Sequence, residues 1–195
     1  MSPKIALIAV HEIYGVNDYM NDVIQTFSSQ QIDVFCPNLL QRTHPFSYEE
    51  EQQAYSYFMK HVGFDVGKEK IETIVTELKK EYTYVGIVGF NVGATIAWRC
   101  SKNTEVNFVI CCYGSRIRDY IDVKPACPAL LLFPKEETSF SVTSLVTYLN
   151  ENNPSLHIQQ FQGEHGFLNR FNKTYHEQSA KDATIIIQSF LHHIF

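Results

Sequence analysis

Short apolar runs alternate along the chain with segments that favour helix. The runs lie at 4–10, 32–36, 84–88, 106–112, 129–133 and 156–161. Apolar residues at helical spacing, or a helix-start signal, predict helices over 17–29, 47–61, 66–80, 94–100, 140–150 and 175–192. Continuous apolar runs are typical of parallel strands that are covered on both faces. The pattern therefore predicts one three-layer α/β/α domain over 1–195, with no linker that would divide it.

Two local signals support the first helices. Asn17 precedes Asp18 and the first helical segment, which is the position of an N-cap. Ser47 is followed three residues later by Glu50, the spacing of a capping box. Both signals place a helix start directly after a polar loop.

Composition narrows the possible function classes. The chain has 195 residues, 45% of them hydrophobic and 19% charged, with a formal net charge of −5. A nucleic-acid-binding protein normally carries a basic field, so no nucleic-acid partner is expected. No apolar run approaches the roughly 18 residues that a membrane span needs. We therefore expect no membrane partner either, and the sequence does not predict the oligomeric state.

The termini and cysteines indicate a location. Residues 1–4 carry one basic side chain, and 5–10 lead directly into His11 without a small-residue cleavage site, which favours a first strand over a signal peptide. The five cysteines are odd in number and lie in apolar segments. Such thiols are typical of a reducing compartment, so a cytoplasmic location is expected.

Polar residues gather directly after the predicted strands, in 11–15, 89–93, 135–137 and 163–167. In parallel sheets, ligands bind beyond the carboxyl ends of the strands. The sequence Gly89-Phe90-Asn91-Val92-Gly93 has the G-x-X-x-G form of a nucleophile elbow, between a strand and a helix. An acid after the fifth strand and His165 after the sixth complete the order nucleophile, acid, histidine that is typical of α/β-hydrolases.

These segments together resemble the dienelactone hydrolase family. The resemblance lies in 11–17 (HEIYGVN), 88–93 (VGFNVG), 113–114 (YG) and 163–167 (GEHGF), and so extends over nearly the whole chain. It implies an α/β-hydrolase fold and a small-molecule ligand or substrate, with the hydrolysis of carboxylic esters or lactones as the activity. The family's usual antiparallel hairpin before the first parallel strand is missing here. We therefore expect about six parallel strands in the order 2-1-3-4-5-6.

The resemblance also implies roles for individual residues. His165 corresponds to the catalytic base and Glu137 to the acid, although the adjacent Glu136 leaves the register of the acid open. Glu12 matches a glutamate that lies close to the nucleophile in the family. The backbone N–H groups of Ile13 and Val92 correspond to the oxyanion hole.

The expected substrate pocket is less well matched. Aromatic side chains near the site can line a pocket, although aromatic residues in such numbers are more often core; these are Tyr14, Tyr55, Tyr113 and Phe167. Arg170 is shifted by one position from an expected basic residue, and Glu51 stands where another would be. An acid in place of a carboxylate clamp argues against an anionic dienelactone as the ligand.

Asn91 is the main departure from the family, whose nucleophile at this position is cysteine. A carboxamide nitrogen shares its lone pair with the carbonyl and is not a useful nucleophile. Loss of a triad nucleophile costs on the order of a million-fold in turnover. The sequence therefore predicts a degenerate Asn-Glu-His triad with weak or absent hydrolysis.

Several interpretations of Asn91 remain open. It is a turn residue that tolerates positive φ in a non-enzymatic binding or scaffold protein, or it holds a water that His165 activates, or it deamidates to aspartate. Cys111 and Cys112 end the fourth strand, where adjacent side chains face opposite sides, and are expected to be structural thiols. No spacing of metal ligands and no nucleotide-binding glycine motif occurs, so neither a metal nor a cofactor is expected.

Overall fold

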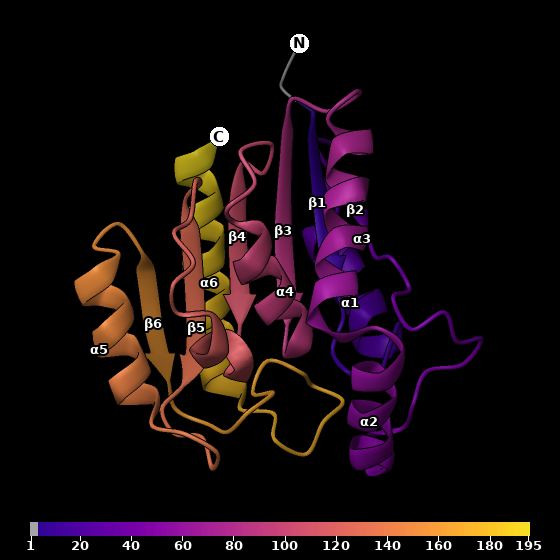
Figure 1. Cartoon of the computed structure of the whole chain (residues 1–195), viewed down its shortest axis with the longest axis vertical. Helices are drawn as coiled ribbons and strands as arrows, with labels where there is room; N and C mark the ends of the chain where they lie inside the picture. Colours follow the sequence, from indigo (N-terminus) through magenta and orange to yellow (C-terminus); the bar gives the residue numbers. More distant parts are fainter. Residues whose placement is uncertain (1–3) are drawn as a thin grey trace.

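The computed structural model describes residues 4–195; Met1 to Pro3, part of the segment expected to lead into the first strand, lie outside the described residues. The six strands form one sheet in the order β2-β1-β3-β4-β5-β6, with every neighbouring pair parallel. Their bounds are β1 Ile5–Val10, β2 Ile32–Phe35, β3 Tyr84–Phe90, β4 Phe108–Cys112, β5 Ala129–Pro134 and β6 His157–Phe161. The predicted strand order is confirmed (Figure 1).

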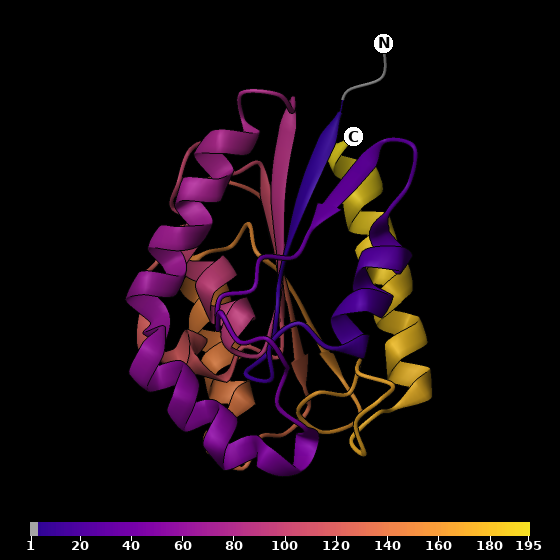
Figure 2. The same cartoon turned by 90° about the vertical axis from the view of Figure 1, so that its right-hand side faces the viewer.

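Helices cover both faces of this sheet (Figure 2). One face carries α1 (Asp18–Phe27) and α6 (Glu177–Ile194). The other carries α2 (Glu51–His61), α3 (Gly63–Leu78), α4 (Val92–Cys100) and α5 (Val142–Asn152). Short 3₁₀ helices lie at Tyr48–Glu50 and Ser115–Tyr120. The three-layer α/β/α architecture predicted from the sequence is therefore confirmed.

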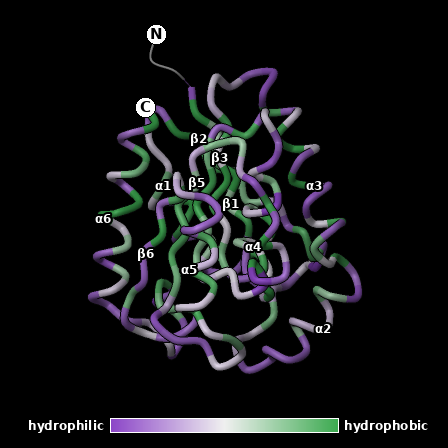
Figure 3. Tube along the Cα trace, turned by 60° about the vertical axis from the view of Figure 1, so that its left-hand side comes forward, coloured by the Kyte–Doolittle hydropathy of each residue, from purple (hydrophilic) through white to green (hydrophobic). Residues whose placement is uncertain are grey.

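The strands alternate between two hydrophobic cores. In β1, Ala6, Ile8 and Val10 face the α2–α5 side, whereas Leu7 and Ala9 face α1 and α6. All six residues of β1 are buried, because a central parallel strand is covered on both faces. In Figure 3 the hydrophobic colouring is concentrated on the strands at the centre, and hydrophilic colouring lies on the outer helices and loops.

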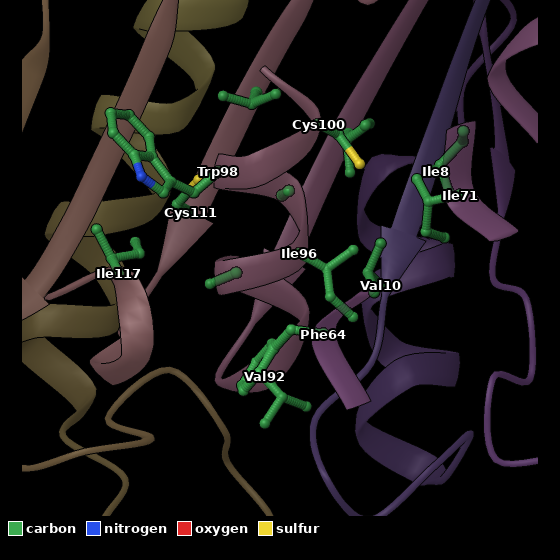
Figure 4. Packing of buried hydrophobic residues seen from close by; sticks show 14 of the residues in the cluster. Ile8, Val10, Phe64, Ile71, Val92, Ile96, Trp98, Cys100, Cys111 and Ile117 are labelled. Carbon is green, nitrogen blue, oxygen red and sulfur yellow. The ribbon is translucent and has the colours of Figure 1, made fainter. Parts of the chain in front are cut away.

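Helix α4 is the most buried of the helices in residues 4–195, and its packing fixes the turn that precedes it. Eight of its residues are buried, and Trp98 Nε1 donates to the carbonyl of Tyr120 at 2.9 Å. Figure 4 shows Val92 and Ile96 of α4 on the side of Phe64 and Val10, whereas Trp98 lies on the side of Cys111 and Ile117. This packing holds the N-terminus of α4 rigidly against the sheet.

The helix-start signals act as predicted, with small shifts in the boundaries. Asn17 Oδ1 accepts from Met20 N at 3.2 Å and caps α1. Glu50 Oε2 accepts from Ser47 N at 2.8 Å, but the first turn after Ser47 is a 3₁₀ helix that leads into α2. The third strand continues to Phe90, two residues beyond the predicted end, and α4 begins at Val92 instead of Ala94. Gly89 therefore lies inside β3 and Gly93 inside α4.

Among the helices of residues 4–195, none combines the length and apolar character that crossing a membrane requires.

Candidate active site

Asn91 lies at the sharp turn between β3 and α4. Its backbone has φ 54° and ψ −115°, the left-handed φ region that most side chains avoid. Asn91 N donates to the carbonyl of Cys112 at 3.0 Å, which ties the turn to the end of β4. The side chain is half-buried and does not cap α4. The structure thus places the Asn91 carboxamide above the carboxyl edge of the sheet.

Close backbone approaches enforce this turn. A Cβ added to Gly89 would lie 2.1 Å from the carbonyl oxygen of Gly93, and one added to Gly93 would lie 2.2 Å from that of Val10. Real side chains do not tolerate such distances, so only glycine fits at either position. The G-x-X-x-G pattern therefore has a steric cause in this chain.

Glu137 and His165 form a hydrogen-bonded pair at the same edge. The pair joins Glu137 Oε1, in the loop after β5, to His165 Nδ1, in the loop after β6, at 2.6 Å. The Glu137 side chain is 8% exposed and that of His165 is 31% exposed. Glu136 is exposed and makes no hydrogen bond with His165 in the described chain. With Nδ1 occupied, Nε2 is the ring nitrogen left for other partners.

Asn91 and His165 are not joined by a hydrogen bond between their side chains within residues 4–195. The His165 ring instead packs edge-on against the ring of Tyr113, with centroids 5.2 Å apart. Any interaction between the carboxamide and the imidazole therefore needs a bridging molecule or a change of rotamer.

Glu12 is a buried carboxylate, 3% exposed, in the loop after β1. Tyr113 Oη donates to its Oε1 at 3.1 Å, and Asn169 Nδ2 donates to its Oε2 at 3.0 Å. Burial raises the pKa of Glu12, while the charge of His165 and the two donors lower it. Both hydrogen-bond partners are neutral, and a positive charge on the His165 ring favours the ionised form of Glu12.

A wider set of polar side chains supports Glu12. Asn169 Nδ2 also donates to Tyr48 Oη at 2.9 Å, and Asn17 Nδ2 donates to the same oxygen at 3.2 Å. The hydroxyls of Tyr19 and Tyr113 lie 3.3 Å apart. The sequence analysis did not identify Asn169, Tyr48 or Tyr19. Asn169 follows His165 by four residues in the same loop, but a loop amide has no periodicity that would single it out.

His11 has a structural part in the same loop. Its Nε2 accepts from Leu39 N at 3.0 Å, and its Nδ1 lies 2.6 Å from the carbonyl oxygen of Glu12. These partners require the neutral ring with the proton on Nδ1. Burial lowers the pKa of His11 from 6.5 to about 4. His11 therefore fixes the Glu12 loop against the segment that follows β2.

The two predicted oxyanion donors have free N–H groups. Val92 is the first residue of α4, so its N–H has no acceptor in a preceding helical turn. The N–H of Ile13 donates no hydrogen bond within the described chain. Both side chains are buried, which leaves the backbone as the part of these residues that can bind a ligand.

Three of the four aromatic residues expected to line a pocket are buried. Tyr14, Tyr113 and Phe167 are at most 5% exposed, so they offer little surface to a ligand. Tyr55 is half-buried, and its hydroxyl accepts from Arg116 Nη2 at 2.7 Å. Burial of this depth is typical of aromatic residues in a protein core.

Arg170 is exposed, in the loop between β6 and α6. It pairs with Asp22 Oδ1 at 2.6 Å in a surface groove of about 460 Å³ that also includes Tyr175 and Ile185. None of the other predicted site residues lines that groove. A second groove, of about 320 Å³, borders the loop after β1 at Gly15 and Val16 and includes Arg42 and His44.

Cys111 and Cys112 are fully buried and belong to different cores on the two faces of the sheet. Burial raises the pKa of both thiols, so neither is a ready thiolate. Within residues 4–195, no group of three or more His, Cys, Asp or Glu side chains is arranged to hold a metal ion.

The parallel sheet, the sharp turn after β3 and the histidine loop after β6 are features of the α/β-hydrolase fold. The chain belongs to the dienelactone hydrolase family, whose sequence model matches residues 1–195. It is 42% identical over 170 residues to the YczH protein of Bacillus subtilis, a match that covers 87% of this chain and 83% of that one; YczH is described as uncharacterized.

Solved structures support the same fold. A dienelactone hydrolase-like promiscuous phosphotriesterase from metagenomic libraries superposes with a TM-score of 0.76 at 9% identity, covering 98% of this chain and 87% of that one. A lidless α/β serine hydrolase from Xanthomonas campestris superposes with a TM-score of 0.71 at 14% identity, covering 99% and 83%. At these identities the likeness concerns the fold alone.

Proposed function

We propose that this protein retains the framework of an ester or lactone hydrolase but lacks its covalent nucleophile. Asn91 occupies the elbow where a family member would have a nucleophilic side chain. The observation that carries the proposal is the combination of the Asn91 backbone, at φ 54° and ψ −115°, with the Glu137–His165 hydrogen bond of 2.6 Å. The elbow is the position of a nucleophilic side chain, but a carboxamide does not react as a nucleophile.

The remaining groups have consistent roles in this proposal. Glu137 orients the imidazole through Nδ1, so that Nε2 is available as a base. The free N–H groups of Ile13 and Val92 would stabilise an oxyanion. Glu12 is held in place by Tyr113 and Asn169 and stabilises a protonated His165. Without a nucleophile, the oxyanion donors and substrate binding alone leave a residual activity of roughly 10³–10⁴ over water, by analogy with triads that have lost theirs.

The test is turnover of activated esters and small lactones by protein whose intact mass shows an unmodified Asn91. We expect rates close to those of a His165→Gln control. Turnover that is fast, saturable and lost in His165→Gln would contradict the absence of a working site. It would instead support the second route for Asn91, in which the carboxamide holds a water that His165 activates.

A non-enzymatic small-molecule-binding role is the second candidate. The groove of about 320 Å³ beside Gly15 and Val16 favours it, because this groove borders the loop that holds Glu12. In that case, a panel of small carboxylic esters and acids should raise the melting temperature without being consumed. A panel that produces no shift in melting temperature would contradict the binding role.

A further inference from the structure

The backbone at Asn91 places the amide nitrogen of Val92 beside the Asn91 side chain. Around the Cα–C bond of an L-residue, Cβ lies about 120° from the backbone nitrogen on the negative side. The ψ of −115° therefore puts Val92 N within about 5° of eclipsing Asn91 Cβ. The four atoms Cβ, Cα, C and Val92 N are nearly coplanar, as they are in a five-membered succinimide ring.

Ordinary secondary structure does not provide this arrangement. In an α-helix or a strand, ψ lies near −42° or +135°, which leaves the following nitrogen roughly 80° or more from Cβ. Asparagine in such segments must leave its backbone conformation before its side chain can reach that nitrogen. At Asn91 the turn holds the required conformation in the native state, because Gly89 and Gly93 pack backbone against backbone on either side of it.

The two reacting groups are also free of competing bonds. The N–H of Val92 begins α4 and has no helical acceptor. The Asn91 carboxamide is half-buried and does not cap the helix, so rotation about its side-chain bonds breaks no capping bond. Both observations lower the cost of bringing Asn91 Cγ to Val92 N.

We propose that Asn91 is a self-deamidation site, at which the elbow converts the asparagine to an aspartate. Val92 N attacks Asn91 Cγ, the bond from Cγ to the side-chain nitrogen breaks, and ammonia leaves with the proton from Val92 N. Water then adds to a carbonyl of the succinimide and breaks its bond to Val92 N. Addition at Cγ gives aspartate, and addition at the main-chain carbonyl gives isoaspartate.

The packing of the turn favours aspartate over isoaspartate. Isoaspartate inserts an extra methylene group into the main chain, between two glycines that do not have room even for a Cβ. Aspartate leaves the path of the main chain unchanged. The catalytic consequence of deamidation rests on the proposed function. The product is then a carboxylate at the nucleophile position, beside Glu137 and His165. A carboxylate, unlike a carboxamide, is an established covalent nucleophile.

The experiment is a peptide map of the purified full chain during incubation at mildly alkaline pH, folded and in urea. In the folded protein, the peptide with Asn91 should lose about 17 Da and later gain about 1 Da relative to its starting mass. Asn21 and Asn38, both exposed, are the internal controls in the same digest. Because the elbow supplies a near-attack geometry, conversion should be at least about tenfold faster folded than in urea.

Two variants at position 91 identify the deamidation product and test whether closure of a five-membered ring causes it. Asn91→Asp provides the chromatographic standard that separates aspartate from isoaspartate. Asn91→Gln has one methylene group more and cannot close a five-membered ring, so it should stay unmodified. An Asn91 peptide that remains intact, or that converts no faster folded than in urea, overturns the inference. That result does not affect the proposed function. The proposed function is contradicted only if protein with intact Asn91 hydrolyses esters through a working site.

Discussion

Asn169 Nδ2 donates to Glu12 Oε2 at 3.0 Å, although the two residues are 157 positions apart in the chain. The contact joins the loop after the first strand to the loop before the last helix. Glu12 is buried, so its carboxylate is stable only when hydrogen-bond donors compensate for the loss of hydration. Tyr113 supplies the other donor, from the end of β4.

Replacement of Asn169 tests this support. Asn169→Leu keeps a similar volume but removes the donor to Glu12 and to Tyr48. An unsatisfied buried acceptor costs about 1–3 kcal/mol, so urea unfolding should show a loss of about 2–3 kcal/mol. Asn21→Ala, an exposed position in α1, is the control and should change stability by less than about 0.5 kcal/mol. Equal effects of the two substitutions would show that the contact does not hold Glu12.

His11 gives stability a defined pH dependence. The unfolded chain takes up a proton on His11 below pH 6.5, whereas the folded protein does so only below about pH 4. The contribution of neutral His11 is therefore complete above pH 6.5 and is lost as the pH falls to about 4. The pKa difference corresponds to about 3 kcal/mol.

The variant His11→Gln isolates this contribution. It should be less stable than the unmodified protein near pH 7, and the gap in free energy of unfolding should narrow by about 3 kcal/mol between pH 7 and pH 4. Urea unfolding at several pH values measures it. A gap that stays constant with pH would mean that His11 is not held neutral by its burial.

Glu12 is expected to respond to the charge at His165. Burial raises the pKa of Glu12 and the His165 charge lowers it, so His165→Gln should raise the pKa of Glu12 further. With its raised pKa, Glu12 contributes stability at low pH that is lost as the pH rises through that pKa. Carboxyl NMR titration reports the value directly. His157→Gln, at an exposed position on β6, is the control; a shift of the same size there would contradict a local interaction.

The two adjacent glutamates should differ sharply once a nucleophile is restored. In an Asn91→Cys background, Glu137→Gln removes the partner of His165 Nδ1 and should lower kcat/KM for an activated ester at least about a hundredfold. Glu136→Gln alters an exposed side chain that makes no hydrogen bond with the imidazole, and should leave kcat/KM within about twofold. Similar losses in both variants would contradict the assignment of Glu137.

The fold was accessible from the sequence because parallel strands produce continuous apolar runs, and the order of elements then limits the topology. The elbow was accessible because its glycines are a steric necessity. The sequence does not determine whether Glu136 or Glu137 hydrogen-bonds to His165, since that depends on the path of the loop after β5. Asn169 and Tyr48 were missed because a buried polar network joins loops that are distant in sequence. Tyr14, Tyr113 and Phe167 belong to a residue type that is more often core than pocket, and the sequence does not show how deeply each side chain is buried.

The central claim is that position 91 is the nucleophile position of an otherwise assembled site. Asn91→Cys tests it most directly, by intact-mass measurement after brief mixing with an activated ester. We expect an acyl adduct on the introduced thiol in Asn91→Cys, no adduct in the parent protein, and loss of the adduct in Asn91→Cys/His165→Gln. A folded Asn91→Cys protein that forms no adduct, or one that is acylated equally without His165, would contradict the account.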